Sequence, residues 1–425
     1  MAVMFVEGFE HGENSATGYN TTADRFPLWN SYNTGTNATA VKETSILPGS
    51  WSAVAMRFAD TSATLNPSFT LTNTSPEAAI PALTGQDRIV GSFRFRFVTS
   101  LPSTNYEMFV LGLSVGSAPR LVFNTTDDKL YAAFDSNLGG TEEVAVSGVL
   151  VADTWYQVDF DWDGTTGTHT LKAMVDGANE NTASFTQTAE VNSNVRLGST
   201  STNGANQATW LMDDLVLDDD GASYPLGPMK VYGLAPNSEG TFDNIGSFAQ
   251  VGGTANDWWT SVDSWGSGGG TFSAAEYIEQ NVNGAEYARL GFESLPSLGS
   301  DVVFGASIAF TIWASTTGAN GASVVLEDGS AASIGEAFFG DCSDTAQRYQ
   351  RLYAAKPPAG GWSESAANAL EIAYGGASAI PGNPRFGACI LQVAVQAGVA
   401  VTDLPPKGRQ LPLPVIGAVN RSRVY

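Results

Sequence analysis

Residues 154–177, TWYQVDFDWDGTTGTHTLKAMVDG, carry a clear strand–turn–strand pattern. Hydrophobic and polar residues alternate on both sides of a turn segment, Asp163–Gly167, and this period of two is typical of half-buried strands. A segment of this length that contains glycine is a usual hairpin loop. The stretch therefore predicts two antiparallel strands, residues 156–162 and 168–175, joined by a tight turn.

The same alternation recurs earlier in the chain, at residues 88–99, RIVGSFRFRFVT. The three phenylalanines share one face of this predicted strand, which we expect to lie against a core, while Arg94 and Arg96 share the other face, which we expect to meet water. Further strands are predicted at residues 107–115, 120–123, 209–217, 302–314, 323–326, 349–355, 369–374 and 389–396.

The chain as a whole is predicted to be all-β, because no window beyond about ten residues has the apolar period of a helix. An acidic turn followed by two prolines, residues 218–228 (DDDGASYPLGP), divides the chain. We therefore expect a first β-sandwich domain at residues 1–225 and a second, sandwich-like one at 226–402. Residues 403–425 are rich in proline and arginine, have no periodicity and are expected to form an extended arm.

The composition excludes several classes of function. The chain has 425 residues with 20 Lys and Arg against 43 Asp and Glu, a net charge of −23, so clustered phosphate contacts to nucleic acid are not expected. No run approaches ~18 consecutive apolar residues, so no membrane insertion is expected. The N-terminus lacks the basic and apolar regions of a signal peptide, which favours synthesis in a cytoplasm. Cys342 and Cys389 are too few for a disulfide framework, and whether they pair stays open.

The hairpin at residues 154–177 also resembles the central hairpin of concanavalin A-like, laminin-G-like jelly rolls. The opening FVEGFE, residues 5–10, and the closing MDDLV, residues 212–216, fit the same pattern. The resemblance covers about residues 1–225 and implies a jelly-roll sandwich in which the first and last strands are neighbours.

The second half is similar to structural proteins of tailed-bacteriophage virions. The similarity rests on LGPMKV (226–231) after the acidic turn, NDWW (256–259), FTIWA (310–314) and GWSESAANALEI (361–372). A proline follows Leu-Gly where the family commonly has an acidic residue. The resemblance implies a virion protein, assembled in the host cytoplasm, with a jelly roll first and a β-rich domain second.

Two enzyme readings were weighed and set aside. Gly112–Gly116 matches G-x-S-x-G around Ser114, but a nucleophile elbow needs a strand, a sharp turn and a helix, and this motif lies within a strand-like run. His169, the histidine that follows in the required order, lies in the predicted hairpin. Asp159, Asp161 and Asp163 share one strand face. They lack the spacing of jelly-roll glucanases, so we expect a solvated edge without catalysis.

A structural Ca²⁺ site is the metal hypothesis that the jelly-roll resemblance suggests. The resemblance places Glu10, on the first strand, beside Asp213 and Asp214 on the last. Carboxylates brought together at the rim of a sandwich repel one another unless a hard cation or water intervenes. The alternative is one inward Asp bonded to the backbone and one outward Asp in water.

The remaining candidate residues are aromatic or lie in the arm. Trp258, Trp259 and Trp362 are candidates for sugar stacking or for an interface, although one of the two adjacent tryptophans is expected in the core. The docking residues that we expect in the arm are Lys407, Arg409, Leu411, Leu413, Arg421 and Arg423. A basic, apolar, Pro-rich segment suits docking on an acidic neighbour such as an identical subunit.

Together, these patterns predict a non-enzymatic structural protein of a tailed-phage virion, associated with the tail or fibre or decorating the capsid. It would form homo-oligomers and make multivalent contacts with other virion proteins. The alternative is a carbohydrate-binding adhesin that recognises a host-surface glycan. Apart from the possible Ca²⁺, no cofactor is expected.

Overall fold

The computed structural model describes residues 3–7, 31–33, 38–43, 55–60, 68–72, 87–112, 118–134, 138, 143–165, 167–186, 194–198, 209–219, 223–240, 247–254, 257–263, 275–282, 286–315, 322–339, 348–354, 356–375 and 383–398. These residues form antiparallel sheets and very little helix, which confirms the all-β prediction.

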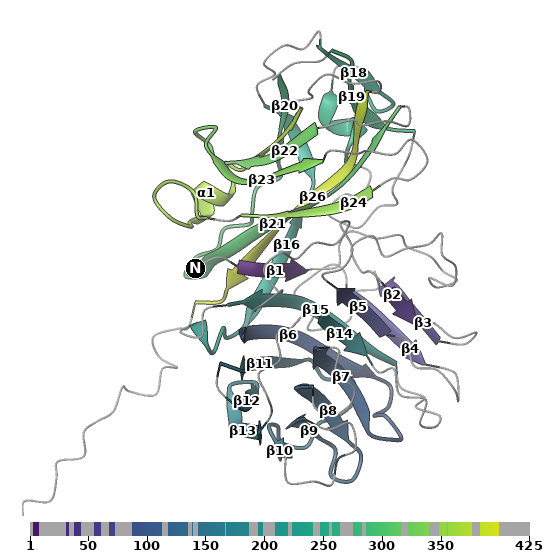
Figure 1. The fold of residues 1–425 in the computed structure, drawn as a ribbon, viewed down its shortest axis with the longest axis vertical. Helices are drawn as coiled ribbons and strands as arrows, with labels where there is room; N and C mark the ends of the chain where they lie inside the picture. The colour runs from purple at the N-terminus through teal and green to yellow at the C-terminus, as the bar shows by residue number, and fades with distance from the viewer. Residues whose placement is uncertain are drawn as a thin grey trace, which may run out of the picture.

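The strands before residue 219 form two sheets (Figure 1). Sheet 1 has the order β13 (Ala178–Thr186), β12 (Thr168–Val175), β11 (Tyr156–Asp163), β6 (Arg88–Val98), β15 (Thr209–Asp218), β4 (Ala55–Asp60) and β3 (Ala38–Glu43), with β1 (Val3–Glu7) also paired to β15. Sheet 2 has the order β10 (Glu143–Ala145), β9 (Lys129–Ala133), β8 (Arg120–Asn124), β7 (Tyr106–Leu111), β14 (Asn194–Gly198), β5 (Ser68–Thr72) and β2 (Ser31–Asn33).

The strands after residue 228 form two further sheets. Sheet 3 has the order β18 (Phe248–Val251), β19 (Tyr277–Gln280), β26 (Pro384–Gln396), β21 (Val302–Ala314) and β24 (Arg348–Tyr353), with β16 (Met229–Leu234) also paired to β26. Sheet 4 has the order β17 (Pro236–Glu239), β20 (Tyr287–Phe292), β25 (Glu371–Gly375), β22 (Ala322–Glu327) and β23 (Ser333–Phe339). The described helices are a 3-10 turn, η3 (Trp258–Ser261), and α1 (Glu364–Ala367).

The first core lies between sheets 1 and 2, and the hairpin of β11 and β12 contributes to it as predicted. β11 pairs with β12 on one side and β6 on the other. Val158 and Phe160 of β11 and the three phenylalanines of β6 are fully buried in this core. The ring of Phe160 packs directly on Gly91 of β6. A side chain at position 91 would overlap this ring, so the position requires glycine.

The second core lies between sheets 3 and 4. Phe310 of β21 and Leu391 of β26 are fully buried, and Tyr374 of β25 stacks on Phe386 with the ring centroids 4.5 Å apart. Cys389 is a free, buried thiol in the same core, where burial raises its pKa to about 12. Cys342 lies outside the described residues.

The two sandwiches meet where sheet 1 and β1 lie beside sheet 3 (Figure 1). β15 ends at Asp218 and β16 begins at Met229, so the acidic, proline-containing segment spans the connection. A small apolar cluster joins the two sides. Its members are Val90, Val216, Leu226, Met229, Val231 and Ala394, with Tyr224 and Phe304 packed against it. The connecting segment is therefore partly buried between the two bodies.

Candidate functional site

The outer face of sheet 1, opposite the first core, is covered by the connecting segment. The expectation that Arg94 and Arg96 meet water is wrong, because they are only 5% and 7% exposed. Arg94 lies over the ring of Trp155, with its guanidinium carbon 5.1 Å from the ring centroid. Arg96 donates a 2.8 Å hydrogen bond to the exposed carboxylate of Asp153. This face is therefore a buried polar layer.

The three aspartates of β11 do not form a solvated edge, so that expectation is also wrong. Asp161 is 7% exposed and receives two bonds from Arg88, from Nε at 3.1 Å and Nη2 at 2.8 Å. Asp163 accepts from the backbone amide and hydroxyl of Thr165 and so closes the hairpin turn. Asp161 is thus held by an arginine and Asp163 by the turn.

Asp159 holds the connecting segment. It is 2% exposed, and its Oδ1 accepts the backbone amide of Gly227 at 2.9 Å. Burial raises the pKa of Asp159 to about 7, although the hydrogen bond from the Gly227 amide acts in the opposite direction. Ser92 also donates to the Gly227 carbonyl at 3.3 Å. The turn at Gly227 is therefore fixed on the sheet by both of its backbone polar groups.

A second carboxylate holds the first strand of the second sandwich. β15 bulges between Asp213 and Val216, and Asp214 lies in the bulge with φ of 55°, a conformation that Asp tolerates better than most residues. Its Oδ1 accepts the backbone amide of Val231 at 2.7 Å, and its Oδ2 lies 3.8 Å from Nη1 of Arg94. Burial raises the pKa of Asp214 to about 6.

Gln157 connects this polar layer to the β12–β13 turn. Its backbone amide donates to Asp176 at 2.8 Å, and its Nε2 donates to the hydroxyl of Ser92. Its side-chain oxygen, Oε1, is buried and has no hydrogen-bond partner among the described residues. The side chain itself is 8% exposed, so this oxygen is an unmet acceptor inside the structure.

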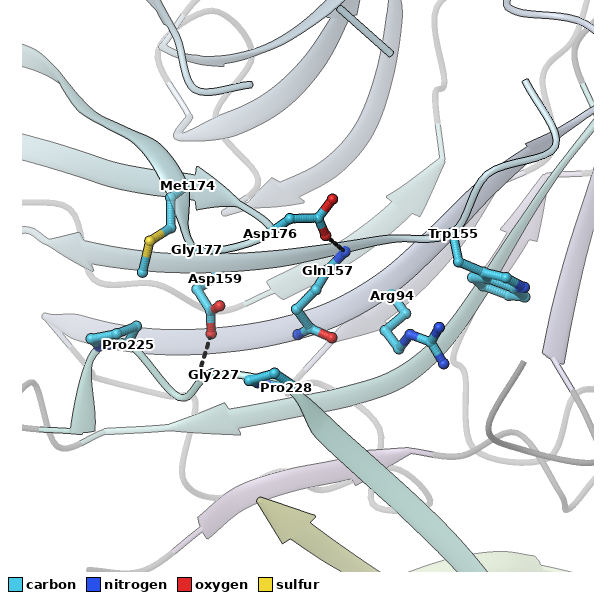
Figure 2. A pocket seen from close by; sticks show the side chains of 10 residues that line it. All are labelled: Arg94, Trp155, Gln157, Asp159, Met174, Asp176, Gly177, Pro225, Gly227 and Pro228. Atoms are coloured by element: carbon cyan, nitrogen blue, oxygen red, sulfur yellow. Dashed lines mark hydrogen bonds between the residues drawn. The ribbon is translucent and has the colours of Figure 1, made fainter. Parts of the chain in front are cut away.

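A groove of about 400 Å³ opens between sheet 1 and the connecting segment. Figure 2 shows it running from Trp155 at one end, past Arg94, Gln157 and Asp159, to Met174 at the other. It is lined by Arg94, Trp155, Gln157, Asp159, Met174, Asp176, Gly177, Pro225, Gly227 and Pro228. Its volume is within the range of small-ligand and short-peptide sites. It is the candidate functional site.

Sequence reasoning did not identify this groove. Trp155 precedes the alternating part of β11, Arg94 was expected to meet water, and Gln157 was not singled out. Two features of the sequence could have indicated the groove. One is Arg94, which lies between two core phenylalanines, and the other is Leu226, which lies between Pro225 and Pro228 in the connecting segment. An apolar residue flanked by prolines in a segment between two domains indicates that the segment is packed against a domain surface and does not lie free in water.

The structure places only part of the proposed Ca²⁺ site. Glu10 lies outside the described residues, and Asp213 and Asp214 are fully buried at the bulge. Asp213 accepts the Asp214 amide at 2.9 Å, while Asp214 binds Val231. Within the described ranges no three His, Cys, Asp or Glu side chains gather as metal ligands. The Ca²⁺ site stays a prediction, and the described oxygens of Asp214 already face an amide and an arginine.

The other predicted residues lie away from the groove. Trp258 is 9% exposed and belongs to the second core, while Trp259 and Trp362 are half-buried against it. His169 is buried beside Trp162 in the first sandwich. Ser114 and the arm residues lie outside the described part of the chain. In that part, no helix has the length and apolar character needed to cross a membrane.

Comparison with known proteins assigns no family. Neither a protein-family model nor a curated protein matches the chain. Among solved structures, "Cellulose induced protein, Cip1" is 12% identical, covering 49% of this chain and 96% of that one at a TM-score of 0.32. Alginate lyase vAL-1 from Chlorella virus is 10% identical, covering 45% of this chain and 93% of that one at a TM-score of 0.31. A sialidase is 12% identical, covering 52% of this chain and 19% of that one at 0.34. Likenesses this weak carry no argument about function.

Proposed function

We propose that this chain is a non-enzymatic structural protein of a tailed-phage particle, in which two β-sandwiches form one body that presents surfaces to neighbouring proteins. The observation that carries the proposal is the use made of the β11 carboxylates. Asp161 is bonded to Arg88, and Asp159 is bonded to the connecting segment. Asp161 is thus neutralised by an arginine within sheet 1, and Asp159 belongs to the joint between the sandwiches, whereas a glycosidase needs two carboxylates directed at its substrate.

The joint also supports multivalent contact. Asp159 and Asp214, on different strands of sheet 1, bind the amides of Gly227 in the connecting segment and of Val231 in β16 of the second sandwich. Two bodies fixed in this way lose little orientational freedom on binding, and repeated copies add avidity. Such a protein can be located in the tail, in a fibre or on the capsid surface. Its proposed partners are identical copies and other virion proteins.

The proposal predicts that the chain is found on intact particles. Antibodies raised against the purified chain, used for immunogold electron microscopy on gradient-purified particles from a lysate of its own phage, should label one recurrent position. Recovery of the chain only from the soluble fraction would overturn the virion role.

A second experiment tests the non-enzymatic role by incubating the purified chain with polysaccharides. Release of oligosaccharides that survives Ser114→Ala and is lost in Asp159→Asn would overturn the non-enzymatic role.

A further inference from the structure

The groove has an unmet hydrogen-bond acceptor and an apolar lining. The side-chain oxygen of Gln157 is buried without a partner among the described residues, and a buried acceptor left without a hydrogen bond is unfavourable. Trp155 closes one end of the groove, and Met174, Pro225 and Pro228 supply much of the remaining wall (Figure 2). A ligand with a free N–H and compact apolar side chains matches this surface.

The residues that follow β26, up to Gly398, lie beside this groove. The backbone amide of Ala397 donates to the carbonyl of Pro228 at 2.9 Å, and the side chain of Gln396 donates to the carbonyl of Leu226 at 2.6 Å. Pro228 is itself part of the groove wall. The chain therefore continues beyond Gly398 from the rim of the groove. Residues 399–410 can span up to about 40 Å, which is ample for the following residues to turn back into it.

The sequence of that continuation has the matching chemistry. Leu411, Pro412, Leu413 and Pro414 alternate apolar and proline residues, which favours a polyproline II conformation. Such a segment forms no internal hydrogen bonds, so the amides of its two leucines are free to donate to an acceptor such as Gln157 Oε1. Proline-rich segments of this kind dock in grooves lined by aromatic side chains.

Charge favours the same segment. Lys407 and Arg409 precede the leucine-proline run, and the groove wall carries the carboxylates of Asp159 and Asp176. Arg94, the cation of the groove, is directed to Asp214 and to the ring of Trp155. A basic segment entering from the Pro228 rim thus meets the exposed carboxylate of Asp176, and the buried Asp159 adds negative charge above its raised pKa.

We propose that, in the protein before assembly, this groove holds residues 405–414 of the same chain. The docked segment shields its apolar residues from water and from neighbouring copies until contacts in the particle replace it. The docking of this segment goes beyond the proposed function, which concerns contacts between subunits, whereas its release on assembly rests on that proposed function.

Photo-crosslinking of the full chain tests the proposal. Leu413→p-benzoylphenylalanine is prepared in unlabelled and ¹⁵N-labelled forms, which are mixed, irradiated and analysed by peptide mass spectrometry. The expected crosslinks join residue 413 to peptides containing Trp155, Asp176 or Pro225, with both peptides carrying the same isotope. Mixed-isotope crosslinks to these peptides would make a second copy the occupant and overturn the proposal. Crosslinks confined to other surfaces would overturn it as well. The same photoprobe at exposed Val282 gives the background pattern.

Variants on both sides of the contact sharpen the test. Trp155→Ala should lower the crosslink yield about tenfold, which corresponds to about 1.4 kcal/mol of binding. Trp259→Ala, a half-buried tryptophan on the other sandwich, should leave the yield unchanged. Because Trp155→Ala also removes a partner of Arg94, the double variant Lys407→Glu and Arg409→Glu is the second probe. It lies outside the described sandwiches and should lower the yield severalfold, whereas an unchanged yield would contradict docking in this groove.

Discussion

Asp214→Ala is expected to lower the free energy of unfolding by about 3–5 kcal/mol, the cost of removing one partner from a buried charge pair. Asp214 is fully buried, and its loss leaves the backbone amide of Val231 without an acceptor and Arg94 without the carboxylate 3.8 Å from it. An alanine in the bulge must also adopt a φ of 55°, which is unfavourable without a polar side chain. Urea unfolding followed by circular dichroism measures the change.

Two control variants isolate the cause of this loss. Asp214→Asn keeps an acceptor for Val231 and tolerates the bulge conformation, so it should cost clearly less than alanine. Asp153→Ala also removes a carboxylate bonded to an arginine of β6, but its side chain is 53% exposed. Because this carboxylate is solvent-accessible, water can take its place beside Arg96, so the loss should be clearly smaller than for Asp214→Ala. Equal losses for Asp153→Ala and Asp214→Ala would contradict the buried joint.

Asp159→Asn is expected to change how stability depends on pH. Burial raises the pKa of Asp159 to about 7 in the folded chain, against 3.8 for the unfolded reference. The folded state therefore binds more protons between these values, and the contribution of this group to stability falls as pH rises from about 4 to 7. The difference between the two pKa values corresponds to about 4 kcal/mol.

Asparagine carries no ionisable proton but keeps an oxygen that can accept the amide of Gly227. Relative to the native chain, Asp159→Asn should therefore gain about 4 kcal/mol of unfolding free energy between pH 4 and pH 8, with urea titrations at each pH as the measurement. The hydrogen bond from Arg96 lowers the pKa of Asp153, so Asp153→Asn should shift the profile in the opposite sense, below pH 4. A difference between Asp159→Asn and the native chain that stays constant with pH would contradict the account.

The strands that could be predicted from the sequence are those whose two faces differ in polarity. The hairpin of β11 and β12 and the phenylalanine face of β6 lie where alternation placed them. β21 matches its predicted bounds, 302–314, because it is long and apolar. β13, with the polar sequence ANENTASFT, was not predicted, because it packs few apolar residues and depends on its pairing with β12.

The candidate site could not be predicted because it depends on a distant segment. Alternation within β6 and β11 separates two faces but does not determine what covers the second one. Residues 225–231 cover it here, more than sixty positions after Asp159. Asp213 and Asp214 were singled out in the sequence as Ca²⁺ ligands, and the bulge that directs Asp214 at the Val231 amide is seen only in the structure.

If the joint holds the two sandwiches as one body, the distance between a site on each of them is fixed. Spin labels attached to cysteines at Val149 and Val282 report that distance by double electron–electron resonance. These side chains are 64% and 49% exposed and lie on different sandwiches. Cys342→Ser removes one native thiol, and Cys389 is buried. The account predicts a single narrow distance distribution at pH 6 and pH 8. A broad or multi-peaked distribution in the native chain would contradict it.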